Sequence, residues 1–592
     1  MRPSWNGKRL ARKLAAVCLL ALAPLVLRAQ VDEAPSTVVR ERAQIPEPDG
    51  PPVTVHGVVV NSVTGEAVAR ALVRIGELRG ALTDSDGRFA IPGVASGVQR
   101  VWAVKPGYGL PETSGENFGE TEHLLRVDKE MPEVRLELRA QNSIGGRVRL
   151  STGGAGEGVG VVLLRQKVED GRVRWERTGE ERRSTPSGAF RFSGLVDGVY
   201  ALKTLPDFAN LRAQEPVCNA DSPADVPGYA STWYGGAADL AGAARIAVKG
   251  GENAEANLTL DLIRFHLVQI TMQNVPTKGE WSFDHQLTGS GGERVESPIR
   301  EEKDHTLCAY LPDGVYSLAV FGALDDELSR SNGSPRPSGG AAAFRAGSLD
   351  FSVEGHAERS LRVALGAAAD TPIYVHYQPG PAPAVKEAPE VERGYIPGEG
   401  EPLSMRGTPV NDGPGDGAQQ IDTFMLSDRT FAMQPAPPGS YWIEAHSNSE
   451  GTCVGEVTSG SQDLSQAPWV VGPSYAGTAI DVTLRTDCAQ LTVEMPASLD
   501  AGAAGYGVRY YVYAVPEFSS LEGVATAVVD QYADRSAKIQ DLTPGRYRVY
   551  AFRTPRAIEF HNPEALRGLP GGQEITLGPN ADATLMVEEA AQ

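Results

Sequence analysis

One phrase, a strand followed by a glycine turn and a returning strand, recurs five times along the chain. The clearest version runs from Phe190 through Gly198 to Tyr200, with apolar residues at alternating positions before the turn. Successive turns are about one small domain apart, so the repeating unit is a domain and not a solenoid repeat. The five turn glycines are Gly97, Gly198, Gly314, Gly439 and Gly545.

Each version of the phrase lies between an opening and a closing strand whose apolar residues alternate. The opening strands are expected at Val55–Val60, Ile144–Leu150, His266–Met272, Ile373–Tyr377 and Leu491–Met495. The closing strands are expected at Leu136–Leu138, Leu258–Leu260, Leu361–Val363, Ile480–Val482 and Leu585–Val587. Strands with one apolar face bury that face against a second sheet. The pattern therefore predicts an all-β chain, a tandem array of about five antiparallel β-sandwich domains of transthyretin-like type.

Composition agrees with many short strands and many turns. The chain has 66 Gly and 42 Pro in 592 residues, and charged residues are 22 % of it, too few for a disordered chain. Helix is expected only as a short start at Asn562–Glu564, where Asn caps and Pro begins a turn. The turn glycines are expected to supply backbone with positive φ.

The strand pattern divides the chain into segments with short linkers. Copies one to five are predicted at residues 53–140, 141–263, 264–367, 368–487 and 488–592. Two stretches depart from the pattern. Residues 379–420 form a Pro/Gly-rich insertion of copy four, either disordered or a long irregular loop, and Ser329–Gly340 is a smaller flexible loop.

The first 29 residues have the pattern of a secretory signal peptide. Basic residues precede an apolar stretch from Leu14 to Leu27, which is too short to span a bilayer, and Ala29 ends a small-residue cleavage site. Val17 before Cys18 does not favour a lipoprotein. Residues 30–52 are interpreted as a flexible leader, and no second apolar stretch of spanning length follows. The mature chain is thus expected in the periplasm, at the cell surface or outside the cell.

The net charge of −20 limits the possible partners. Removal of the basic signal peptide makes the mature chain more acidic still. An acidic surface repels phosphate backbones and anionic lipid, so nucleic acid and membrane surfaces are disfavoured as partners. High solubility is the simplest reading of the charge.

Four cysteines remain after the predicted signal peptide, an even number that permits two disulfides in an exported chain. None has C-x-x-C spacing, which disfavours zinc and redox sites. Cys453 and Cys488 flank strands that can be neighbours and are predicted to pair. Cys308 is expected at an inward position, either as a buried thiol or bonded to Cys218 of copy two.

Copy one resembles a known family. It has an opening strand His56–Val60, small residues at Thr64–Val68 and a hairpin Asp84–Phe89 with the spacing Asp-x-x-Gly-x-Phe. These features resemble the carboxypeptidase regulatory-like domain, a transthyretin-like sandwich grouped with carbohydrate-binding-like folds. Copy one departs at the final Tyr, where Gln99 stands, and copies two to five keep the core phrase but lose the Asp-Gly hairpin. The resemblance implies a non-catalytic accessory module in an exported bacterial protein of tandem copies.

Motifs with catalytic or metal-binding precedent are each better explained by local structure, so no catalytic, metal or cofactor residue is predicted. His561 and Glu564 have H-x-x-E spacing, but no His follows as a third zinc ligand. Asp84 and Asp86 lack the remaining ligands of a calcium loop. The glycine-rich run at residues 154–160 matches no phosphate loop. His285 and His305 follow Asp residues without any accompanying hydrolase motif.

Three aromatic residues are the only candidates for ligand contact. Trp233 and Tyr234 lie in a glycine-rich loop and Trp175 in a charged strand, where flat rings can stack on sugars. Packing over the end of a sandwich is the competing interpretation of these three residues.

The sequence therefore predicts a non-enzymatic protein with a structural, adhesion or protein-binding role at the cell envelope. Its partner would be an unknown protein or polysaccharide of the envelope. The alternative is a carbohydrate-binding protein that uses the loop aromatics. A peptidase accessory chain that retains activity and an outer-membrane receptor are the less favoured classes.

Overall fold

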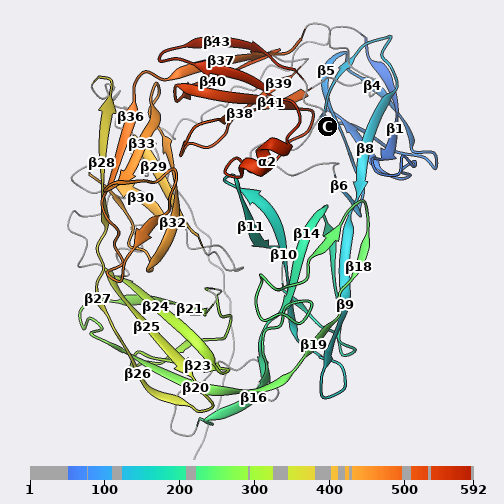
Figure 1. Cartoon of the computed structure of the whole chain (residues 1–592). Helices are drawn as coiled ribbons and strands as arrows, with labels where there is room; N and C mark the ends of the chain where they lie inside the picture. Colours follow the sequence, from blue (N-terminus) through green and yellow to red (C-terminus); the bar gives the residue numbers. More distant parts are fainter. Residues whose placement is uncertain are drawn as a thin grey trace, which may run out of the picture. The chain divides into compact units, whose positions relative to one another are not determined.

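The computed structural model describes residues 51–588 with gaps at 77, 110–122, 180, 209–221, 291, 293, 325–343, 381–401, 411–420, 426–429, 497–508 and 531–534. The predicted signal peptide, residues 30–50 of the leader and the loop Ser329–Gly340 lie outside the described residues. The described part of the chain is a tandem array of β-sandwiches (Figure 1).

Copy one shows the plan that the other copies follow. Its strands are β1 (Val53–Asn61), β2 (Leu72–Ile75), β3 (Arg79–Leu82), β4 (Arg88–Val94), β5 (Gly97–Val104), β6 (Tyr108–Gly109), β7 (His123–Val127) and β8 (Val134–Ala140). One sheet has the order β4-β1-β8-β6 and the second β3-β2-β5-β7. Alternate residues such as Val59 of β1, Val73 of β2 and Val101 of β5 are fully buried between them. The predicted alternation thus builds the core.

Copy two repeats this plan. Its strands are β9 (Asn142–Leu150), β10 (Gly160–Glu169), β11 (Arg172–Arg177), β12 (Arg182–Arg183), β13 (Ala189–Leu195), β14 (Gly198–Thr204), β17 (Ile246–Val248), β18 (Asn253–Glu255) and β19 (Leu258–Leu260). The first sheet is β13-β9-β18 with β19 beside β9, and the second is β11-β10-β14-β17 with β12 beside β10.

One sheet of copy three includes two strands from the segment assigned to copy two. Its strands are β20 (Leu262–Gln273), β21 (Trp281–Gly289), β22 (Arg300–Glu301), β23 (Thr306–Leu311), β24 (Gly314–Leu324), β25 (Phe344–Val353), β26 (Glu358–Ala364) and β27 (Gly366–Ala367). The strands β15 (Asp207–Phe208) and β16 (Asp225–Tyr229) fall before residue 264, yet they extend the sheet of β20. A boundary drawn at 263/264 therefore cuts through one sheet.

Copy four has a single nine-stranded sheet that folds over on itself. Its strands are β28 (Thr371–Gln378), β29 (Leu403–Pro409), β30 (Ile421–Met425), β31 (Phe431–Met433), β32 (Gly439–Ser447), β33 (Cys453–Ser459), β34 (Gln462–Asp463), β35 (Trp469–Val471) and β36 (Ile480–Arg485). The strand β30 pairs with both β29 and β31 and so joins the two halves.

The strand β29 corrects the prediction that residues 379–420 are an insertion throughout. It pairs along its length with β32 and contributes Leu403 and Met405 to the core. The dense Pro and Gly around it hid its short alternation of apolar residues. Residues 381–401 and 411–420 lie outside the described part of the chain.

Copy five contains the strands β37 (Ala489–Glu494), β38 (Arg509–Pro516), β39 (Ala525–Asp530), β40 (Ser536–Leu542), β41 (Gly545–Phe552), β42 (Gln573–Leu577) and β43 (Asp582–Met586). The predicted helix start is confirmed by α2 (Pro563–Gly568), where the Asn562 side chain accepts hydrogen bonds from the N–H groups of Glu564 and Ala565. In Figure 1, α2 lies on the side of β38 and β41, away from β37, β40 and β43.

The sheets are mainly antiparallel, as predicted, and every copy adds a parallel pairing that the sequence did not predict. Each opening strand pairs in parallel with its closing strand: β1 with β8, β9 with β18 and β19, β20 with β26, β28 with β36, and β37 with β43. All other pairs in these sheets are antiparallel. A parallel closing strand leaves a copy at the end opposite to the chain's entry. The next copy can therefore begin within a few residues, as β9 does after β8.

Positive φ occurs mainly before the turn glycine rather than at it. Gly93, Gly194 and Asp541, four residues before the turn glycines, have φ of 73°, 77° and 56°. The register of the strand pair shifts at each of these sites, so they form β-bulges. The predicted positive φ is found at Gly97 and Gly198, with values of 107° and 158°. Gly545 is required for space instead, since a Cβ there would lie 2.3 Å from the Phe518 ring.

Candidate functional site

The tyrosine that follows the turn glycine fastens the turn in copies two to five. The hydroxyl of Tyr200 donates to the carbonyl of Val196 at 2.7 Å, and that of Tyr547 to Thr543 at 2.7 Å. Tyr316 and Tyr441 do the same to Pro312 and Pro437 at 2.8 Å. This is a tyrosine corner, a side-chain bond back to the chain four residues upstream. Copy one has Gln99 at this position and lacks the bond.

Copy two lacks the Asp of the copy-one hairpin, as the sequence indicates, but it keeps the turn geometry with Thr185 in the place of Asp84. In copy one, Asp84 accepts from the N–H of Arg88 at 2.8 Å, and in copy two the Thr185 hydroxyl accepts from the N–H of Ala189 at 3.1 Å. Gly87 and Gly188 have matching φ of 71° and 76°. Asp84 and Asp86 therefore serve a turn, since Asp84 also accepts from the N–H of Asp86.

His305 occupies the same turn position in copy three. Its φ is 60°, and its carbonyl accepts from the N–H of Met272, as the Gly87 carbonyl accepts from Val59. Its Nδ1 lies 2.7 Å from Glu301 Oε1. His285 lies on β21, where burial lowers its pKa. In copy three, His305 is therefore a turn residue and His285 a buried residue of a strand.

The candidate stacking residues of copy two lie together over its second sheet. Trp233 is 3 % exposed and packs on Val162 and Leu164 of β10. Trp175 on β11 is half-buried beside this cluster, with the Arg245 guanidinium 4.5 Å from its ring centre. Tyr234 packs against the core between the sheets. The surroundings of Trp233 are those of a packing residue, with no open face for a sugar.

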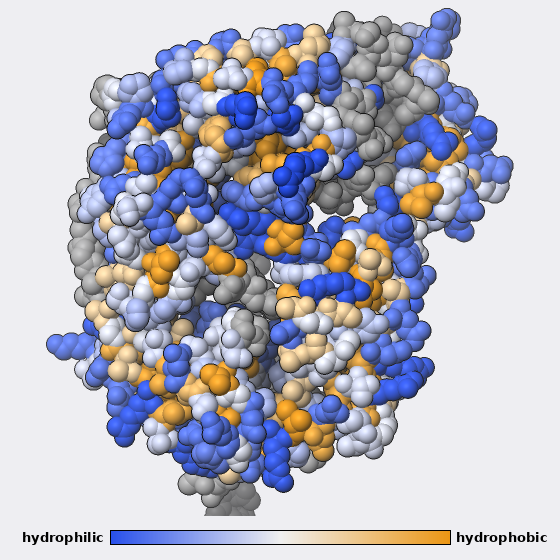
Figure 2. Space-filling model, viewed as in Figure 1, coloured by the Kyte–Doolittle hydropathy of each residue, from blue (hydrophilic) through white to orange (hydrophobic). Residues whose placement is uncertain are grey.

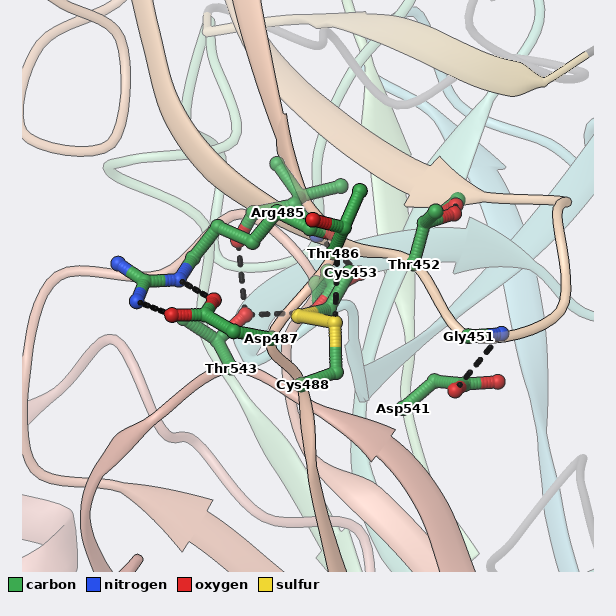
Figure 3. The surroundings of a disulfide bond; sticks show 12 residues. Gly451, Thr452, Cys453, Arg485, Thr486, Asp487, Cys488, Asp541 and Thr543 are labelled. Carbon is green, nitrogen blue, oxygen red and sulfur yellow. Dashed lines mark hydrogen bonds and ion pairs between the residues drawn. A yellow bond between two sulfur atoms is a disulfide. The ribbon is translucent and has the colours of Figure 1, made fainter. Parts of the chain in front are cut away.

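A disulfide joins Cys453 at the start of β33 to Cys488 in the linker before β37 (Figure 3). The S–S distance is 2.06 Å and the Cα atoms are 6.0 Å apart. The strands β33 and β36 are neighbours with Cys453 opposite Arg485, which brings the two cysteines together. The bond ties copy four to the linker that leads into copy five.

The expected inward position of Cys308 is wrong. Cys308 is fully buried, but its neighbours Leu307 and Ala309 face the core, so its side chain lies on the opposite face of β23. A shift of one residue along a strand reverses the face. Cys308 is disulfide-bonded. Its proposed partner Cys218 lies outside the described residues.

Glu522 lies at the copy four–five junction, and no motif in the sequence marks it. Its carboxyl accepts from the Val454 N–H of copy four at 2.7 Å and lies 3.1 Å from the Thr543 hydroxyl of copy five. Burial raises the pKa of Glu522 to about 7. Thr543 has one hydroxyl proton and donates it to the Val454 carbonyl at 2.7 Å. A protonated Glu522 can therefore donate to Thr543 and complete this network.

Other junctions also hold specific contacts that sequence reasoning missed. Lys203 of copy two, 4 % exposed, forms an ion pair with Glu296 of copy three at 2.6 Å. The Tyr475 hydroxyl of copy four donates to the Gly347 carbonyl of copy three at 2.6 Å. At the copy four–five junction the N–H of Gly451 also donates to Asp541 at 3.1 Å (Figure 3). Residues far apart in sequence make these pairs, so no local motif marks them.

The H-x-x-E motif lies at the start of α2, where the N–H of His561 donates to the Gly171 carbonyl of copy two at 3.3 Å. Glu564 lies in the first turn of α2, 3.9 Å from Arg567, and the ring of His561 contacts that of Phe560 at 4.3 Å. Within the described residues no group of three or more potential metal-ligating side chains comes together. In that same part of the chain, no helix is long and apolar enough to cross a membrane.

One family model matches part of copy one. Residues 54–122 match the carboxypeptidase regulatory-like domain, which agrees with the resemblance found from the opening strand and hairpin. No curated protein matches the chain.

Several solved structures of bacterial proteins are similar at low identity. The Bacillus anthracis TIE protein is 11 % identical, with a TM-score of 0.16, over 53 % of this chain and 50 % of its own. The minor pilin GBS52 of Streptococcus agalactiae is 12 % identical, with a TM-score of 0.18, over 38 % of this chain and 99 % of its own. The major pilin BcpA of Bacillus cereus is 8 % identical, with a TM-score of 0.12, over 76 % of this chain and all of its own. The chain thus spans about half the length of the first of these proteins.

Proposed function

We propose that the chain is an exported, non-catalytic string of β-sandwiches with a structural, adhesion or protein-binding role at the cell envelope. The observation that carries this proposal is that neighbouring copies are joined by specific contacts. The Lys203–Glu296 pair, the Tyr475 bond and the Cys453–Cys488 disulfide each tie one copy to the next or to its linker. Such contacts give neighbouring copies defined points of attachment, which suits a protein whose domains act together as a spacer or an adhesion surface.

The disulfides support export. They persist in the periplasm and outside the cell and are rare in the cytosol. The candidate catalytic residues also favour a non-catalytic role, because Asp84, His305 and Glu564 serve turns and a helix end. We propose five domains, at residues 53–140, 141–263, 264–367, 368–487 and 488–592. The boundary at 263/264 needs adjustment, because the strand β16 before it pairs with β20 of copy three.

The test has two parts. Export is tested by sequencing the N-terminus of the protein recovered from the periplasmic, surface and culture fractions, with cleavage after Ala29 expected. The binding role is tested by capturing partners from native envelope extract on the mature chain. An uncleaved protein in the cytosol contradicts export. A chelator-sensitive hydrolysis of a peptide panel contradicts the non-catalytic role.

Carbohydrate binding remains the second prediction from the sequence, but the burial of Trp233 does not favour it. A glycan array probed with the mature chain tests it. Binding that is lost in a Trp175→Ala variant would revive this alternative, whereas a blank array would remove it.

A further inference from the structure

The second sheet of copy one has an outer face with an unusual combination of side chains. Leu72 pairs with Leu82 on β3 and with Val104 on β5, so the three form one apolar row. Leu82 is 62 % exposed and Val104 50 % exposed. In the next row Arg74 lies opposite Trp102. We call Leu72, Arg74, Leu82, Trp102 and Val104 the copy-one face.

The corresponding face is covered by the chain itself in copies two and five. In copy two the connection from β14 to β17 places Trp233 over Val162 and Leu164. In copy five the connection from β41 to β42 places Ile558 and the apolar side of α2 over β38 and β41. The outer face of this sheet is thus a surface on which a polypeptide segment packs.

No described segment covers the copy-one face in this way. The connection from β5 to β7 includes β6, which pairs with β8 of the other sheet. The exposure of Leu82 and Val104 leaves apolar surface available. Figure 2 shows hydrophobic groups distributed among hydrophilic ones on the visible side of the molecule. The row of Leu82, Leu72 and Val104 places three apolar residues side by side, and exposed apolar residues that are contiguous indicate an interaction site.

Charge indicates the kind of partner. The charged residue in the rows of Leu72 and Trp102 is Arg74, and the outward positions of β2, β3 and β5 carry no carboxylate. Arginine beside an aromatic ring is the type of residue that dominates protein interfaces. The chain as a whole has a net charge of −20, whereas this face is positively charged. Its charge is therefore complementary to carboxylates of a partner.

We propose that the copy-one face binds a polypeptide segment of a partner protein, one that presents apolar side chains together with Asp or Glu. The apolar residues would cover Leu72, Leu82 and Val104, as Trp233 covers copy two, and a carboxylate would pair with Arg74. The inference rests on the protein-binding part of the proposed function and specifies its surface.

The test selects ligands from random 12-residue peptides displayed on phage, with the purified mature chain as bait. A Leu82→Ser/Arg74→Glu double variant serves for counter-selection. Enriched peptides are expected to combine aromatic or aliphatic residues with Asp or Glu. Fluorescence anisotropy of one synthetic peptide should then show an affinity about tenfold lower for each single variant. Val470→Ser and Arg264→Glu are matched exposed controls in other copies and should leave the affinity unchanged.

Three outcomes would overturn the proposal. They are no enrichment, enrichment of basic peptides, and equal loss of affinity in the controls. Two further results would show that the copy-one face binds something other than a partner peptide. These are self-association of the mature chain that depends on Leu82, and binding of an anionic polysaccharide without peptide binding. The selection uses purified protein, so a failure of envelope location or export leaves its result interpretable.

Discussion

Copy one and copy five share one topology but differ in how their surfaces are closed. Copy five has a tyrosine corner at Tyr547, a covered outer face and a junction fastened to copy four through Glu522. Copy one has Gln99 in place of the tyrosine and an exposed outer face. The same sandwich can thus complete its packing within the chain or leave one face for a partner. The predictions below test this difference.

The largest expected effect is on the covered face of copy five. Phe552 is 2 % exposed and packs under the segment that contains Ile558. A Phe552→Ala variant should lose about 3–5 kcal/mol of unfolding free energy. The matched Trp102→Ala variant of copy one, which removes a half-buried ring, should lose about 1 kcal/mol or less. Urea denaturation of both variants measures this, and equal losses would contradict the comparison.

The next effect comes from the disulfide at the copy four–five junction. A Cys453→Ser/Cys488→Ser double variant should lose about 2–4 kcal/mol of unfolding free energy, because the disulfide closes a loop between residues 35 positions apart in the sequence. Thermal denaturation should show the loss in copies four and five, with copy one unchanged. Mass spectrometry under non-reducing conditions provides the control, and alkylation of Cys453 in the native protein would contradict the pairing. The same experiment tests the proposed Cys218–Cys308 pair.

A smaller effect is expected from the tyrosine corner. A Tyr547→Phe variant removes the 2.7 Å bond to Thr543 and should cost about 1 kcal/mol. A Gln99→Ala variant at the equivalent position of copy one should change stability by less than about 0.5 kcal/mol. If the tyrosine variant unfolds at the wild-type urea concentration, the corner contributes nothing to copy five.

The pH dependence of the copy four–five junction gives a further prediction. The pKa of Glu522 is about 7 in the folded chain, above its ordinary value of 4.5. A raised folded pKa means that the protonated form is stabilising, so stability should fall as the pH rises from about 4.5 through 7. A Glu522→Gln variant should show a smaller fall while it keeps the amide in contact with Thr543, and the remaining fall comes from Glu444, whose pKa burial raises to about 8. A variant with the wild-type pH profile would exclude Glu522 as the titrating group.

Much of the fold was predictable because strand alternation and turn residues are local signals. The opening and closing strands and the cap at Asn562 are found where the sequence places them. The parallel pairing of β1 with β8, however, depends on residues that are far apart in sequence. The strand β29 was missed because Pro and Gly surround it. The Lys203–Glu296 pair and Glu522 were missed for the same reason as the parallel pairs, since burial and partners come only with the fold.

The candidate sites show the same limit. The pairing of Cys453 with Cys488 could be inferred from strands that flank them, whereas the burial of Trp233 under its own loop could not. The copy-one face was not visible in the sequence either. Leu72, Leu82 and Val104 lie on three strands, and only the register brings them into one row.

The most direct test of the open copy-one face is hydroxyl-radical footprinting of the chain in intact native cells and of the purified protein. If a partner covers this face, Leu82, Trp102 and Val104 become protected in the cells, while Val315 and Val470, which are 58 % and 56 % exposed, react equally in both samples. Unchanged reactivity at Leu82 and Val104 would contradict the claim that copy one offers its open face to a partner.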